Sequence, residues 1–127
     1  MLYAFPGDPG SKITPKGKYE NFIGGKWVAP VKGQYFDNIS PVNGKVICQI
    51  PRSTAEDIEL ALDAAHAAKD KWGATSVTER SNILLKIADV MEANLELLAV
   101  AETYDNGKGV RETLAADMPL AIDHFRY

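Results

Sequence analysis

The sequence has little cysteine, no long hydrophobic run and no strong charge imbalance. Its single cysteine, Cys48, excludes an intramolecular disulfide and a zinc site built from several cysteines. No apolar run approaches the roughly 20 residues that a membrane-spanning helix needs. The first residues lack the basic start and apolar stretch of a secretory signal. A net charge of −3 gives no footprint for a nucleic-acid backbone. These absences predict a cytoplasmic protein without a membrane or nucleic-acid partner.

The composition changes near Arg52, which divides the chain into two parts. Residues 1–52 hold six of the seven prolines and seven of the ten glycines and carry a net positive charge. Residues 53–127 are net negative and rich in Ala, Leu and Glu. Proline and glycine punctuate turns, whereas Ala, Leu and Glu favour helices. The sequence therefore predicts an α+β fold, in which a short hairpin or ribbon precedes about four helices.

In the first part, glycines and prolines separate short runs of β-forming residues. Two adjacent glycines, Gly24 and Gly25, permit the positive φ of a two-residue hairpin turn. The predicted elements are a flexible N-terminal arm at 1–18, a hairpin at 21–28, and strands at 34–39 and 45–50. Residues 19–127 are expected to form one domain segment, with strands and turns over 19–52 and helices over 53–127.

Capping residues and apolar periodicity predict four helices in the second part. They span 54 to about Trp72, 76 to about Met91, 95–105 with Asn94 as N-cap, and about 110–125. The first helix has an apolar stripe formed by Ile58, Ala61, Leu62, Ala65, Ala68 and Trp72. The expected buried face of the second consists of Ile83, Leu84, Ile87, Val90 and Met91. Asn106 and Gly107 are expected to end the third helix.

Two features predict that these residues belong to a larger folding unit. The third helix, over 95–101, is apolar on nearly every side, and such a helix normally has neighbours all round. The ribbon and the other three helices are not expected to cover it. The fourth helix also stops at Tyr127 without a glycine, proline or cap for its last carbonyl groups.

No group of residues forms a catalytic constellation. Cys48 lies inside a predicted strand without a local base, which favours a buried structural thiol. His66 has Asp63 and Asp70 on the same helical face, but one histidine with two exposed acids is a weak metal site, as is His124 beside Asp123. The Gly107-Lys108-Gly109 run lacks the spacing of a phosphate loop and is read as a helix stop. Packing is the expected role of Trp27 and Trp72.

Seven segments, in order from about residue 19 to the end, resemble the NAD(P)-dependent aldehyde dehydrogenases, and in particular a bacterial acetaldehyde-oxidising branch. The segments are 19–28 (YENFIGGKWV), 38–46 (NISPVNGKV), 57–68 (DIELALDAAHAA) with Trp72, 78–84 (TERSNIL), 102–108 (ETYDNGK), 111–113 (RET) and 117–127 (DMPLAIDHFRY). Two residues depart from the family pattern. Ser40 stands where Asn is commoner, and Gly109 stands where Pro usually follows the lysine.

The resemblance implies a much longer chain, of which these residues are the first part of an α/β Rossmann-like cofactor domain. It places the catalytic cysteine, the general-base glutamate, the oxyanion-holding asparagine and the NAD contacts later in the sequence, so no catalytic or cofactor-binding residue is expected here. The implied reaction oxidises short aliphatic aldehydes to carboxylic acids through thiolate attack, hydride transfer to NAD and thioester hydrolysis. Family analogy also implies a homo-oligomer.

The resemblance further implies one possible site, for a monovalent cation. Its ligands would be the main-chain oxygen of Ile39 and the carboxylate of Asp105, since such ions prefer hard oxygen ligands. The alternative is that Asp105 caps its helix or pairs with a lysine. Two other functions remain open: a helical module that binds a separate protein through its apolar surplus, and a stand-alone α+β domain.

Overall fold

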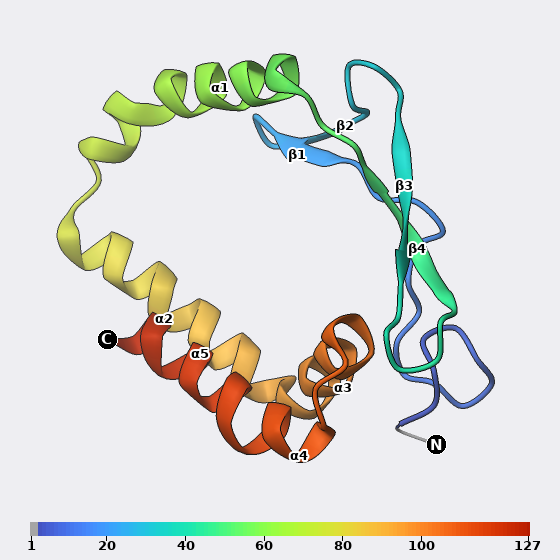
Figure 1. The fold of residues 1–127 in the computed structure, drawn as a ribbon. Helices are drawn as coiled ribbons and strands as arrows, with labels where there is room; N and C mark the ends of the chain where they lie inside the picture. Colours follow the sequence, from blue (N-terminus) through green and yellow to red (C-terminus); the bar gives the residue numbers. More distant parts are fainter. Residues whose placement is uncertain (1–2) are drawn as a thin grey trace. The chain divides into compact units, whose positions relative to one another are not determined.

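The computed structural model describes residues 3–127 (Figure 1). The chain forms two compact units, each described by itself. Unit 1 comprises Met1–Pro15, Ile39–Ile47 and Val77–Tyr127, and unit 2 comprises Lys16–Asn38 and Cys48–Ser76. Residues 1–2 of the predicted arm lie outside the described residues. The predicted division at residue 18 stays a prediction.

A β-hairpin opens unit 2, as predicted. Strands β1 (Asn21–Ile23) and β2 (Lys26–Val28) pair antiparallel, with Phe22 opposite Trp27. The turn residues Gly24 and Gly25 have φ angles of 59° and 79°, which only glycine adopts readily. The two aromatic rings meet with centroids 5.1 Å apart, yet Trp27 remains 56% exposed. The expectation that Trp27 is a packing residue is therefore only partly met.

The two later strands also form where the sequence predicts them. Strands β3 (Tyr35–Ile39) and β4 (Val46–Pro51) make a second two-stranded sheet. Pro51 is the last residue of β4, where the missing N–H of proline is tolerated. Cys48 is buried in β4, as expected for a structural thiol.

Helix α1 (Ala55–Gly73) of unit 2 begins with a capping box formed by Thr54 and Asp57. Oδ2 of Asp57 accepts the backbone N–H of Thr54 at 2.7 Å, and its Oδ1 accepts that of Val31 at 2.8 Å. These two hydrogen bonds stabilise the ionised carboxylate and lower the pKa of Asp57. Asp57 is buried, so the cap also ties the loop at Val31 to the start of α1.

The apolar stripe of α1 is not covered by unit 2. Ile58, Leu62 and Trp72 are each about half exposed. The expected packing role of Trp72 stays a prediction, because its side chain is 50% exposed in the described residues. The helical periodicity was read correctly, but periodicity indicates which face is apolar and not what covers it.

Unit 1 is helical and forms most of the core. Its helices are α2 (Val77–Ala93), α3 (Leu95–Asn106), α4 (Val110–Glu112) and α5 (Met118–Arg126), with a π turn, η1 (Thr113–Asp117), between the last two. Helices α2 and α5 lie side by side (Figure 1). The buried apolar residues of this unit are Ala88, Ala99, Val100 and Ile122.

The burial of two helices by neighbouring segments differs from the sequence prediction. Helix α3, expected to lack neighbours, buries Ala99 and Val100 and half-buries Leu97 and Leu98. Helix α2 is the poorly covered one. Of its predicted buried face, Ile83, Leu84, Ile87 and Val90 are all exposed, and only Met91 is half-buried. The reason is that α5 covers one side of α2, around Ala88, and nothing described covers the other.

Two details of the helix ends also differ. Asn94 occupies the N-cap position of α3, but its side chain donates to the carbonyl of Val90 at 2.8 Å instead of capping α3. The predicted single helix over 110–125 contains the π turn, which its apolar periodicity does not reveal. None of the described helices is both long and apolar enough to span a membrane.

Candidate functional site

The loop after β3 lies against the C-terminal end of α3 within unit 1. Ser40 is fully buried, and its hydroxyl donates to the carbonyl of Tyr104 at 2.5 Å. Helix α3 ends at Gly107, whose φ is 83° and whose N–H donates to the carbonyl of Thr103 at 2.9 Å. A Cβ atom at Gly107 would lie 2.9 Å from Cγ of Pro41. Glycine therefore permits both the helix end and the close approach of the loop.

This contact brings the two predicted cation ligands onto adjoining segments. Ile39 directly precedes the docked Ser40, and Asp105 directly follows Tyr104. Both residues are exposed. No group of three or more His, Cys, Asp or Glu side chains among residues 3–127 could hold a metal. A monovalent ion bound partly by main-chain oxygen does not require such a group, and the site stays a prediction.

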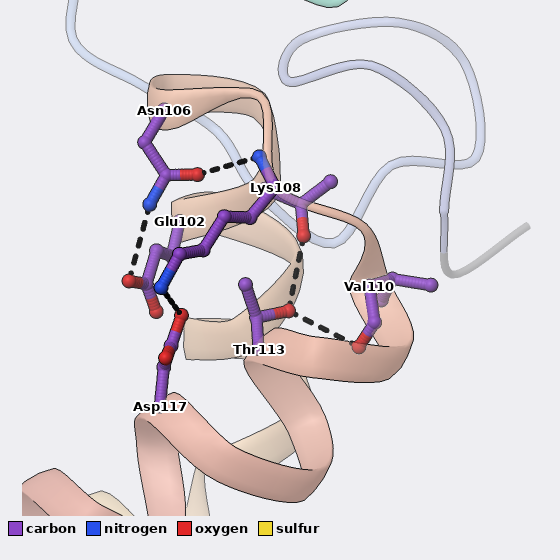
Figure 2. A network of polar contacts seen from close by, with 7 residues as sticks. Glu102, Asn106, Lys108, Val110, Thr113 and Asp117 are labelled. Atoms are coloured by element: carbon purple, nitrogen blue, oxygen red, sulfur yellow. Dashed lines mark hydrogen bonds and ion pairs between the residues drawn. The ribbon is translucent and has the colours of Figure 1, made fainter.

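A polar network links the end of α3, the same turn and η1 (Figure 2). Nζ of Lys108 donates to Oδ2 of Asp117 at 2.7 Å, and the Lys108 N–H donates to Oδ1 of Asn106 at 2.8 Å. Nδ2 of Asn106 donates to Oε1 of Glu102 at 3.2 Å. The hydrogen bond to Asp117 stabilises the charged ammonium group and so raises the pKa of Lys108.

Two threonine hydroxyl groups, of which that of Thr113 is buried, join α3 to η1. Oγ1 of Thr113 lies 3.0 Å from Oγ1 of Thr103 and donates to the carbonyl of Val110 at 3.1 Å. Thr113 is fully buried. Oε2 of Glu102 is a buried oxygen without a hydrogen-bond partner among the described residues. The network thus fixes the turn between α3 and α4, but it presents no nucleophile next to a base.

An apolar hollow of about 160 Å³ lies beside this junction. It is lined by Tyr3, Val42, Val100, Thr103, Tyr104 and Val110. The hydroxyl of Tyr104 donates to the carbonyl of Tyr3 at 2.5 Å, and the ring of Phe5 meets that of Tyr104 edge-on at 5.3 Å. The described N-terminal residues therefore contact α3 at the rim of the hollow.

The sequence analysis missed the residues of this junction apart from the glycines and Lys108. Glu102, Thr103, Thr113 and Asp117 come together only because the chain turns at Gly107. No spacing in the sequence signals the contact between Lys108 and Asp117, because residues nine positions apart lie on opposite faces of a regular helix. The helix-stop interpretation of Gly107-Lys108-Gly109 is confirmed by the left-handed φ of Gly107.

The remaining candidates behave as surface or core residues. His66 is exposed, together with Asp63 and Asp70, and these three do not form a metal-binding group. Nδ1 of His124 lies 2.7 Å from the carbonyl of Leu120, one turn earlier in α5. The part of the chain that the structure describes therefore brings no predicted residues together as a catalytic site.

The fold is similar to part of known NAD-linked enzymes. An aldehyde dehydrogenase from Bacillus cereus, solved as an NAD+ complex, matches with a TM-score of 0.81 and 30% identity over 87% of this chain and 23% of its own. An indole-3-acetaldehyde dehydrogenase from P. syringae matches with a TM-score of 0.82 and 29% identity, over 91% and 23% of the two chains.

Sequence comparison agrees with the structural neighbours. Residues 27–127 match the model of the aldehyde dehydrogenase family, and the chain therefore belongs to that family. It is 78% identical to an aldehyde dehydrogenase of Deinococcus radiodurans over 98% of this chain. It is 75% identical to a long-chain-aldehyde dehydrogenase of Acinetobacter sp and 72% identical to an acetaldehyde dehydrogenase of Pseudomonas aeruginosa, over its whole length. The chain spans about a quarter of the length of these relatives.

Proposed function

We propose that this chain is the N-terminal scaffold segment of an NAD-dependent aldehyde dehydrogenase that oxidises short aliphatic aldehydes to carboxylic acids. The observation that carries the proposal is high identity to aldehyde dehydrogenases about four times as long. The exposed apolar faces of α1 and α2 support it, since such faces are normally covered. The remainder of the enzyme is the proposed cover. The same exposure would suit a module that binds a separate protein, which is the alternative.

The described residues do not fit NAD themselves. A dinucleotide site needs a glycine-rich turn leading from a strand into a helix, and Gly107-Lys108-Gly109 instead joins two helices. The proposal therefore assigns NAD binding and the catalytic cysteine to residues outside this chain. The role of this segment would be to support that domain through the exposed apolar faces of α1 and α2.

We expect the isolated chain to produce no NADH from NAD and acetaldehyde, because the proposal assigns the catalytic cysteine and its general base to residues outside this chain. A chimera should be active. Replacing the matching segment of the Pseudomonas aeruginosa acetaldehyde dehydrogenase with this chain should retain kcat/KM within about tenfold of the parent enzyme. The assay is NADH absorbance with acetaldehyde and with a long-chain aldehyde.

The control for the chimera is the parent enzyme without the matching segment, which should be inactive. Turnover by the isolated chain would contradict the assignment of the chemistry to other residues. A folded but inactive chimera would contradict the scaffold role and favour the separate interaction module.

We also propose a monovalent cation at the main-chain oxygen of Ile39 and the carboxylate of Asp105. The support is the Ser40–Tyr104 hydrogen bond, which holds the two segments against each other. We expect the protein to have a Tm roughly 5 °C higher in KCl or NaCl than in choline chloride of equal ionic strength, because a bound ion stabilises the folded state. Asp105→Asn should abolish the difference, and Asp123→Asn, an exposed acid of α5, should retain it.

Equal Tm values in all three salts would contradict the cation site and favour Asp105 as a helix-capping or pairing residue.

We further propose that the whole enzyme is a cytoplasmic homo-oligomer. This rests on family analogy and on the absence of a membrane-spanning helix among the described residues. Light scattering of the active chimera measures its assembly state.

A further inference from the structure

The tripeptide Asn-Gly-Lys occurs twice in the chain. One copy, 43–45, lies in the turn between β3 and β4, and the other, 106–108, lies where α3 ends. An asparagine followed by glycine is prone to spontaneous deamidation, because glycine has no Cβ to keep its backbone nitrogen away from the asparagine side chain. Both copies belong to unit 1, so one fold presents the same reactive pair in two settings.

The deamidation reaction needs only water. The glycine nitrogen, after losing its proton, attacks Cγ of the asparagine, and the bond from Cγ to Nδ2 breaks as Nδ2 takes up a proton and leaves as ammonia. Water then opens the five-membered imide at either of its two carbonyl groups, which gives aspartate or isoaspartate. The net change is the gain of one water, the loss of one ammonia and one new negative charge.

The two copies start from nearly the same local geometry. The N–H of Gly44 donates to the carbonyl of Ser40 at 2.8 Å, and that of Gly107 donates to the carbonyl of Thr103 at 2.9 Å. The φ angles of the two glycines are 70° and 83°. In each copy the lysine N–H donates to Oδ1 of the asparagine, at 3.0 and 2.8 Å. A difference in reactivity must therefore come from the surroundings.

The space around the two glycines differs. Closing the imide ring requires the glycine nitrogen to leave its hydrogen bond and turn toward Cγ, which shifts the glycine. A Cβ built at Gly44 meets nothing within 4 Å, so this glycine has open space beside it. At Gly107 the same atom would lie 2.9 Å from Cγ of Pro41. The docked loop therefore opposes the shift at Gly107, and nothing comparable opposes it at Gly44.

The asparagine side chains also have different partners. Nδ2 of Asn106 donates to Oε1 of Glu102 at 3.2 Å, which holds the amide in place (Figure 2). Among residues 3–127, Nδ2 of Asn43 has no such partner. Glu102 and Asp105 also add two negative charges close to Gly107 in the chain, and these disfavour the loss of a proton from its nitrogen.

We propose that Asn43 is a site of spontaneous deamidation in the folded chain, and that the contacts of Asn106 and Gly107 protect the second copy of the same tripeptide. Asn43 is exposed, so water reaches the imide. The modification adds a negative charge to the turn that follows Ser40 and, in the isoaspartate product, one backbone methylene group. The proposal rests on the fold of unit 1 alone, so it stands apart from the proposed function.

The test follows both sites by mass spectrometry in the full 127-residue chain, incubated at mildly alkaline pH with and without guanidinium chloride. Trypsin releases residues 33–45 and 87–108, and fragmentation places the mass increase of deamidation on Asn43 or on Asn106. In denaturant the two sites should react at similar rates. In the folded chain, with its helical signal checked by far-UV circular dichroism, Asn43 should react at least about tenfold faster than Asn106.

Variants test the cause of the protection. Glu102→Ala frees the amide nitrogen of Asn106 and should speed deamidation there without changing the rate at Asn43. Asp123→Ala removes an exposed acid of α5 and should change neither rate. An Asn106 rate that Glu102→Ala leaves unchanged would overturn the role assigned to that hydrogen bond.

Equal rates at the two sites in a folded chain would overturn the proposal, as would an Asn43 that reacts in denaturant but not in the folded chain. If the isolated chain lacks the helical signal, the same two peptides are measured in the active chimera. The same outcomes then decide the question, because the chimera contains both tripeptides.

Discussion

Replacing Gly107 with alanine should destabilise the chain by more than the strain of its backbone angle alone. At φ 83°, any L side chain costs about 1–2 kcal/mol relative to glycine. The added Cβ would also lie 2.9 Å from Cγ of Pro41, closer than van der Waals contact allows. The loop holding Ser40 must then move away from α3. Denaturant unfolding, with the midpoint read at constant m-value, measures the loss.

Gly44 provides the matched control for this substitution. It has a similar φ of 70°, but a Cβ at Gly44 meets nothing within 4 Å. Gly44→Ala should therefore show the strain without the clash. Equal losses in the two variants would show that the contact between Pro41 and Gly107 contributes nothing. A larger loss of unfolding free energy for Gly107→Ala than for Gly44→Ala measures the contribution of the loop that docks on α3. The proposed cation site depends on this docking.

Asp57→Asn should lower the unfolding midpoint at neutral pH. The carboxylate accepts two backbone N–H groups, whereas an amide offers one oxygen and turns an NH2 group toward the other donor. A buried N–H without a partner is destabilising. The effect should exceed that of Glu56→Gln, whose carboxylate is exposed and lies 3.7 Å from Lys32.

The effect of Asp57 should also depend on pH in a defined direction. Its folded-state pKa lies below the ordinary aspartate value of 3.8, so its stabilisation is present above that value. It is lost as the pH falls through the lower folded-state pKa. The gap between wild type and Asp57→Asn should therefore narrow on acidification below pH 3.8. A gap that stays constant down to full protonation would contradict the assigned hydrogen bonds.

The turns and helix ends could be read from the sequence because local chemistry determines them. Gly24 and Gly25 allow a hairpin turn that other residues resist, and Gly107 ends α3 in the left-handed region for the same reason. The strands and helices start and stop within about two residues of the prediction. The segment around Thr54 and Asp57 likewise predicts a helix start, and the structure adds that Asp57 also holds Val31.

Burial could not be read in the same way. The apolar face of α2 was identified by its spacing, but α5 covers only the side near Ala88 and leaves Val90 56% exposed. Helix α3 has the less amphipathic sequence and is the better buried. Periodicity reports the direction of side chains around one helix, whereas cover depends on where other segments arrive.

The candidate site also has features that local sequence predicts and features that depend on tertiary contacts. The identity of Asp105 and Ile39 as possible ligands came from a family resemblance carried by local motifs. That Ser40 docks beside them, and that Lys108 reaches Asp117, depends on the path of the chain around Gly107. No spacing rule connects residues 64 positions apart.

The sequence by itself determined the secondary structure, the position of the turns and the family, because each follows from residues close together along the chain. Only the tertiary structure decided which apolar faces stay open, how the loop at Ser40 meets α3, and that the last helix contains a π turn. These depend on contacts between distant segments, whose energies local patterns do not contain.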